Sequence, residues 1–185
     1  GLLGLSAGFI GGRLDSIIMR FVDILFAFPG LILAIVIAGL LGASSRNAML
    51  AIGVIYAPAF ARVIRGSVLS VKSELYIESG RVAGASSWQI VFKHIIPNIL
   101  APMIVLVTVY LSSAILAEAG LSFLGLGTQP PEPSWGGMLN AARTYMELNA
   151  WMAIAPGLAI MFVVLGLNFL GDGLRDVLDP RLRER

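Results

Sequence analysis

The chain alternates long uncharged runs with short polar segments. Three runs, each of 20 to 24 residues, contain no Asp, Glu, Lys or Arg: 24–45, 98–117 and 148–171. A transmembrane helix needs about 20 apolar residues to cross the hydrocarbon core of a bilayer. A fourth stretch, 49–71, carries only two charges, Arg62 and Arg65, and both lie in its second half, where they can reach the headgroups. The pattern therefore predicts four full membrane spans.

Residues 1–12 are also apolar, and they resemble the tail of a further span. We therefore expect the chain to be truncated at its N-terminus. Pro29, Pro58 and Pro156 fall inside predicted spans, where neighbouring helices can satisfy the carbonyls that proline frees. Buried helices of a soluble protein would show amphipathic faces, and barrel strands would alternate, but the first run is apolar all round. The prediction is an all-α membrane protein.

Composition supports this class, because 57% of the residues are hydrophobic and only 13% are charged, against roughly 25% in soluble domains. The chain has no Cys and one His, which argues against a metal site and against a Ser-His-Asp triad. Its net charge of +2 is too small to suggest binding to nucleic acid. Four spans place eleven of the 13 Lys and Arg residues on one side, which predicts that this side is cytoplasmic. The eleven are Arg13, Arg20, Arg62, Arg65, Lys72, Arg81, Lys93, Arg175, Arg181, Arg183 and Arg185.

One cytoplasmic segment, 72–97, is polar between two apolar spans. Gly84 is the type of residue that ends a helix, and Ser86 with Gln89 forms an S-x-x-Q capping box that begins one. We expect a short helix over 87–95, with Lys93 and His94 in its last turn and Pro97 marking the entry to the next span.

The short helix would be amphipathic. Trp88, Phe92 and Ile95 recur at i, i+4 and i+7, which places them on one helical face. Such a helix either rests on lipid headgroups or docks in a groove of a partner, and the local pattern leaves both open.

This segment resembles the cytoplasmic loop of the permease subunits of ABC importers, Glu-Ala-Ala-x3-Gly-x9-Ile-x-Leu-Pro. Glu78, Gly84 and Pro97 stand at that spacing, while Ser79 and Gly80 replace the alanines, His94 the Ile and Ile96 the Leu. "HIIPN" resembles the dipeptide, oligopeptide and nickel branch. So do four further blocks that cover the chain: "GGRLD", "RFVDILFAFPG", "AEAGLSFLGLGTQPPEPSWGGML" and "GDGLRDVLDPR".

The resemblance implies the core of a type I ABC importer transmembrane domain over 1–185, N-terminally truncated, with a cytoplasmic coupling loop at 72–97 and a periplasmic loop at 118–147. It implies a multi-pass protein of a bacterial or archaeal inner membrane, with its C-terminus in the cytoplasm. The partners implied are two ABC ATPase subunits, a homologous permease subunit, an extracytoplasmic substrate-binding protein and membrane lipid. ATP would be bound by the ATPases, so this chain would need no cofactor and would not be an enzyme.

The implied role of the 84–97 helix is to couple the permease to an ATPase. Glu78 would hold the loop in shape, and Gly84 and Pro97 would bound the helix. The residues expected at or near the ATPase groove are Ala85, Ser86, Ser87, Trp88, Gln89, Phe92 and Lys93.

Other residues have two interpretations each. Glu118, at the outer end of a span, either faces a cationic solute in the pathway or pairs within the outer loop. The Gly- and Pro-rich stretch 123–139 either docks a binding protein or closes the rim. Small residues in the spans suit close helix packing: Gly39, Gly42, Ser112, Ser113, Gly157 and Gly166.

Other functional classes fit poorly. An intramembrane enzyme would need a nucleophile with a base, or paired carboxylates, within the spans, and a carrier would need mid-membrane charges. The chain also lacks the G-x-x-x-x-G-K-[ST] loop that binds ATP phosphates. The leading interpretation is a subunit for import of peptides or related small solutes.

Overall fold

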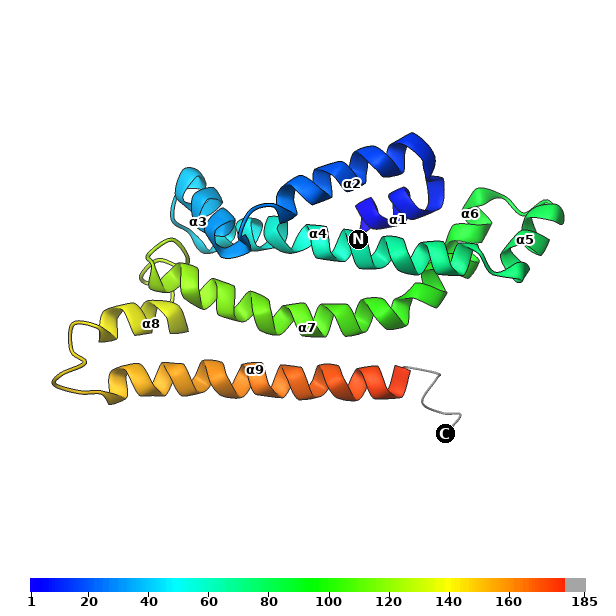
Figure 1. Cartoon of the computed structure of the whole chain (residues 1–185). Coiled ribbons are helices and arrows are strands. Elements are labelled where there is room, and N and C mark those ends of the chain that lie inside the picture. The colour runs from blue at the N-terminus through cyan, green and yellow to red at the C-terminus, as the bar shows by residue number, and fades with distance from the viewer. Residues whose placement is uncertain (179–185) are drawn as a thin grey trace. The chain divides into compact units, whose positions relative to one another are not determined.

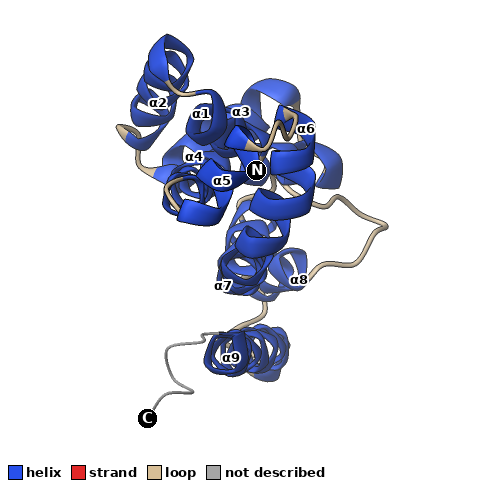
Figure 2. Cartoon of the chain, turned by 90° about the vertical axis from the view of Figure 1, so that its right-hand side faces the viewer, coloured by secondary structure: helices blue, strands red, loops and turns tan. Residues whose placement is uncertain are grey.

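The computed structural model describes residues 1–178, and Figure 2 shows that this part of the chain consists of helices joined by loops. Three predictions, for Arg181, Arg183 and Arg185, lie outside the described residues, as do the end of the "GDGLRDVLDPR" block and the C-terminus. The elements, labelled in Figure 1, are α1 (Leu2–Ile10), α2 (Gly12–Phe26), α3 (Gly30–Leu41), α4 (Ser45–Lys72), α5 (Leu75–Val82), α6 (Ser87–Gln89), the π-helix η1 (Ile90–Ile95), α7 (Ile96–Phe123), α8 (Trp135–Ala142) and α9 (Trp151–Leu178).

Three helical runs of the described residues are long and apolar enough to cross a membrane. These are Ser45–Lys72, Ser87–Phe123 and Trp151–Leu178. They confirm three of the predicted spans, with Pro58 and Pro156 inside helices as expected. α7 extends to Phe123, further than predicted, so Glu118 lies within the helix and not at its end.

The predicted span over 24–45 is not one helix. α2 ends at Phe26 and α3 begins at Gly30, so this region counts as a fourth span only if the broken pair is taken together. Pro29 explains the break, because it has no N–H to donate and restricts the residue before it to extended conformations. Pro29 takes φ −57° and ψ 121° and stands at the N-cap of α3.

Contacts divide the chain into two units. The first comprises residues 1–27, 57–107 and the described residues from 172, and the second comprises 28–56 and 108–171. α4, α7 and α9 each contribute to both units.

In the first unit, α1 packs closely on α4 through glycines. A Cβ at Gly4 would overlap the backbone of Ala61, and one at Gly8 would lie 2.9 Å from Val68. Small residues four apart allow two helix backbones to approach in this way. Gly4, Ala7 and Gly8 are accordingly the buried residues of α1.

Ion pairs join α2 to α4 in the same unit. Arg65 donates to both carboxylate oxygens of Asp15, at 2.5 and 2.6 Å, and Arg62 donates to Asp23 at 2.8 Å. The two-armed geometry of a guanidinium suits a carboxylate in this arrangement. The acidic side chains of α2 are therefore used within the fold.

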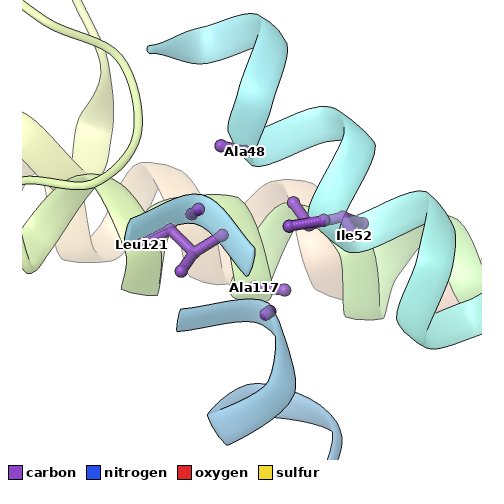
Figure 3. Packing of buried hydrophobic residues seen from close by; sticks show 7 residues of the cluster. Ala48, Ile52, Ala117 and Leu121 are labelled. Carbon is purple, nitrogen blue, oxygen red and sulfur yellow. The ribbon is translucent and has the colours of Figure 1, made fainter. Parts of the chain in front are cut away.

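The second unit has an alanine-rich core, in which short side chains bring α3, α4 and α7 together (Figure 3). Ala48 and Ile52 of α4 meet Ala117 and Leu121 of α7, as the labelled sticks show. All four are buried. This core fixes the end of α7 that carries Glu118.

Candidate functional site

The polar segment begins with α5 and turns sharply at Gly84, as predicted. Gly84 has φ +85°, in the left-handed region that suits glycine. Its N–H donates to the carbonyl of Arg81 at 3.0 Å, and that of Ala85 donates to the carbonyl of Gly80 at 2.9 Å. Together these two bonds form a Schellman motif, which satisfies the last carbonyls of α5.

The next helix begins with the predicted capping box. The amide of Gln89 donates to Ser86 Oγ at 3.3 Å, and the amide of Ser86 donates to Gln89 Oε1 at 2.9 Å. Each bond satisfies a donor that a helix start leaves free. The segment therefore has a defined start within two residues of the turn.

Its far end differs from the prediction. The helix does not stop at Pro97 but continues through η1 into α7, so Ser87–Phe123 is one helical run. Lys93 and His94 are consequently not at a helix C-terminus. The wider turn of a π-helix gives room for the proline ring near the preceding carbonyls. Asn98 Nδ2 also donates to the carbonyl of His94 at 2.7 Å.

The inner side of the segment is held by aliphatic side chains. We call them the aliphatic cluster, and its buried members are Ile64 and Val68 of α4, Ile77 of α5, Ile90 and Ile95 of η1, and Ile99 of α7. Ile95 was predicted to share a face with Trp88 and Phe92, and this is wrong. The π-turn aligns residues five apart, so Ile95 turns inward with Ile90.

The outer side presents aromatic rings. Trp88 and Phe92 stack with ring centroids 4.7 Å apart and planes at 18°, and they are 72% and 53% exposed. Ser87 and Lys93 are exposed beside them. One helical segment thus joins a buried aliphatic side to an exposed aromatic one.

A hollow of about 450 Å³ runs between this segment and α1. Leu5 and Phe9 line it from α1, and Trp88, Val91 and Phe92 line it from the segment. Lys72, at the end of α4, is hydrogen-bonded to α1, since its Nζ donates to the carbonyl of Phe9 at 2.7 Å. The exposed aromatic side is therefore concave next to α1.

The remaining predicted residues lie around this surface. Ala85 is half-buried and packs against the aliphatic cluster, whereas Glu78 and Pro97 are exposed. The Glu78 carboxylate makes no hydrogen bond or ion pair with another residue in the described part of the chain. The ring of His94 lies 5.9 Å from that of Tyr76, which connects η1 to α5.

Glu118 belongs to the second unit and is hydrogen-bonded to the last turn of α7 and to the loop that follows it. Its Oε1 accepts hydrogen bonds from Ser122 Oγ at 2.6 Å and Thr128 Oγ1 at 3.1 Å. The amide of Thr128 donates to Ser122 Oγ at 2.9 Å. Glu118 also borders a concavity of about 400 Å³ that Trp135 and Met138 help to line. The carboxylate thus fixes the chain that follows α7.

These arrangements present a surface to which another molecule can bind. Within residues 1–178, no three His, Asp or Glu side chains gather closely enough to hold a metal ion. The capped segment offers an aromatic, partly concave face on a packed base, which suits docking of another protein chain.

Sequence reasoning missed the aliphatic cluster and the hollow beside α1. Ile90 and Ile95 stand five residues apart, a spacing that fits neither the α-helical nor the strand period. That Ile90 and Ile95 share a face can be predicted only if a π-turn is assumed. The hollow has no signal in the sequence, because it depends on contacts between segments about 80 residues apart.

Comparison with known proteins identifies similar chains along this whole sequence. The family described as "Binding-protein-dependent transport system inner membrane component" matches residues 1–184. The glutathione transport system permease protein GsiD of Pectobacterium atrosepticum is 49% identical over 181 residues, which are 98% of this chain and 60% of the relative.

Two further relatives are named for peptides. The dipeptide transport system permease protein DppC of Alkalihalophilus pseudofirmus is 46% identical over 98% of this chain and 60% of its own length. The di/tripeptide transport system permease protein DppC of Pseudomonas aeruginosa is likewise 46% identical, with the same coverage. The chain therefore spans about 60% of the length of these relatives.

Proposed function

The chain belongs to the family of binding-protein-dependent transport system inner membrane components, and from this premise we propose that it is a permease subunit of an ATP-driven importer. It forms half of a translocation pathway through the inner membrane. ATP is bound and hydrolysed by separate ATPase chains, so this subunit needs no cofactor of its own.

The observation that carries the proposal is the two-sided segment at 84–97. Its exposed side, with Trp88 and Phe92, docks on an ATPase, and its buried side transmits the movement through the aliphatic cluster to α4 and α7. Packed cores shift between discrete arrangements and do not deform continuously. The helix runs unbroken into α7, so a push on the segment reaches a membrane span directly.

Charge supports an inward-facing position for this segment. Lys93 lies on the segment, and Lys72 and Arg81 lie in the part of the 72–97 loop that precedes it. The Lys and Arg bias of membrane proteins favours the cytoplasm for such a loop. The loop that contains α8 then faces outward, where a substrate-binding protein delivers the solute. A homologous permease subunit completes the pathway.

The substrate class follows from the relatives. They are named for glutathione, dipeptides and di/tripeptides, so we propose that this system imports short peptides or peptide-like solutes. All of these solutes carry amide groups and free termini.

Glu118 has a structural role in this proposal. Its bonds to Ser122 and Thr128 favour a role in holding the outer loop over direct contact with solute in the pathway. Uptake by a Glu118→Gln variant separates the two roles, since glutamine still accepts both bonds but loses the charge. Retained uptake supports the loop role, and lost uptake with an intact complex supports the pathway role.

The test of the proposal is whether the complete importer retains its ATPases after Trp88→Ala. Trp151→Ala is the matched control, because Trp151 is a tryptophan of similar exposure, 68%, at the start of α9. We expect Trp88→Ala to lose ATPase subunits on co-purification and to lose uptake, while Trp151→Ala keeps both. Equal retention in the two variants would exclude the docking role of this face.

A further inference from the structure

α2 has an outward apolar strip that packing within the chain does not use. Leu14, Ile17, Phe21 and Ile24 recur at steps of three and four residues, which places them on one face. The last three are each more than half exposed, whereas Val22, on the opposite face, is buried. α2 therefore has apolar residues on both its inner and its outer side, unlike a surface helix of a soluble protein, whose outer side is polar.

Two arginines border this strip. Arg13 and Arg20 are seven residues apart, so they lie on the same side of α2, next to Ile17 and Ile24. Both are exposed, and neither makes an ion pair with another described residue. The acidic groups of the helix cannot compensate them, because Asp15 and Asp23 are paired with arginines of α4. α2 thus presents two free cations beside an exposed apolar strip.

The two ion pairs between α2 and α4 determine how deep the apolar strip lies in the bilayer. α2 is paired at Arg62 and Arg65, seven to ten residues before the end of α4 at Lys72, which is about 10–15 Å along the helix axis. A helix of 28 residues is about 42 Å long, and the hydrocarbon core is about 30 Å thick. If α4 spans the bilayer, its last turns extend beyond the core, and α2 lies near the boundary between acyl chains and headgroups.

We propose that α2 lies in the inner leaflet and that Arg13 and Arg20 bind the phosphate groups of anionic phospholipids. The apolar strip enters the acyl region while the two guanidiniums reach the headgroups, as in interfacial amphipathic helices. Two fixed cations favour an anionic headgroup over a zwitterionic one, because a compensating positive group is absent from the lipid. The choice of leaflet rests on the proposed orientation of the subunit, but the lipid preference does not.

The experiment uses the complete importer in detergent, titrated with phosphatidylglycerol or with phosphatidylcholine and read by native mass spectrometry. Each basic residue near a bilayer surface contributes about 1 kcal/mol of attraction to anionic lipid, which is about fivefold in affinity. We therefore expect Arg13→Gln and Arg20→Gln each to weaken phosphatidylglycerol binding about fivefold, and the double variant to lose at least one retained lipid. Phosphatidylcholine binding should not change.

Arg175→Gln is the matched control. Arg175 is also exposed and basic, but Asp172 stands three residues before it and Asp176 directly after it, and these two negative charges oppose attraction of an anionic lipid. We expect this variant to bind phosphatidylglycerol like the wild type. A double variant of Arg13 and Arg20 with unchanged phosphatidylglycerol binding would overturn the proposal.

A second contrary outcome is also informative. If the double variant separates the two permease subunits while lipid binding is unchanged, the arginines face an acidic surface of the partner and not lipid. The readout requires neither ATP hydrolysis nor solute. Retention of the ATPases by the Trp88→Ala variant, with lipid selectivity intact, would therefore refute the proposed coupling and leave the lipid site standing.

Discussion

Replacing Gly84 with alanine isolates the contribution of one backbone turn to the candidate docking segment. Gly84 has φ +85°, and a Cβ built on it would meet no atom within 4 Å. The substitution therefore introduces no clash, and its cost is that of the left-handed conformation itself. For an L-residue that cost is about 1–2 kcal/mol.

This cost acts on the bonds that Gly84 makes possible. The amides of Gly84 and Ala85 donate to the last carbonyls of α5, and the capping box at Ser86 follows directly. A penalty of about 1–2 kcal/mol lowers the ratio of intact to altered turn about 5- to 30-fold. If an ATPase binds only the intact turn, its apparent affinity is proportional to the fraction of molecules in which the turn is intact.

Gly80→Ala is the control for this prediction. Gly80 lies inside α5, has no neighbour within 4 Å of an added Cβ, and does not have positive φ. The same chemical change should there stabilise the helix by about 0.5–1 kcal/mol. The assay is titration of the complete permease with its ATPases, read as the apparent dissociation constant. If both variants bind ATPase equally well, the reasoning about the turn is refuted.

Three further perturbations test other parts of the structure. Ser86→Ala removes the cap and should weaken the start of the segment by about 0.5–2 kcal/mol, visible as faster amide exchange there, whereas Ser86→Asp should retain most protection. Asp15→Asn should lower thermal stability by about 1 kcal/mol, and Asp23→Asn by less, because the Asp23 pair is more exposed; equal losses would contradict this. Gly4→Leu should separate α1 from α4 at a cost of about 1–3 kcal/mol in thermal denaturation, while Gly39→Leu, in open space, should cost far less.

Much of the fold could be predicted from local signals. Two uncharged runs and a third run with only two charges indicated three of the helices, and Gly84, Ser86 and Gln89 marked a turn and a helix start that the structure confirms. These features depend on residues close together in sequence. Their physical causes, a missing Cβ and two side-chain oxygens, are visible in the residue types themselves.

The two wrongly predicted helix boundaries both lie at a proline whose effect on the helix depends on the neighbouring residues. Pro29 was expected inside a span, but it ends the helical run and begins another, whereas Pro97 was expected to end a helix and lies within a continuous one. The difference is the π-turn before Pro97, which widens the helix and changes the direction of Ile95. Helix propensities of single residues do not predict such a π-turn.

Long-range contacts also escaped prediction. The glycines expected to permit close packing included Gly39, Gly157 and Gly166, yet a Cβ at any of these meets no described atom within 4 Å. Close approaches lie instead at other glycines, Gly4 and Gly8 of α1 among them. Which small residue faces a neighbour depends on how helices rotate against each other, and uniformly apolar sequences do not specify that rotation.

The docking of the 84–97 segment on an ATPase is open to direct measurement by cross-linking. Residues 1–185 contain no cysteine, so a single introduced thiol is unique within them. Ser87→Cys places it on the exposed side of the segment, and Arg46→Cys places one near the other end of α4. In the assembled importer we predict that a short cross-linker that joins a thiol to a lysine amine links the Ser87→Cys variant to an ATPase subunit and that the Arg46→Cys variant gives no such product. ATPase cross-linking from Arg46→Cys alone, or from neither position in an intact complex, would contradict the proposed role of the segment.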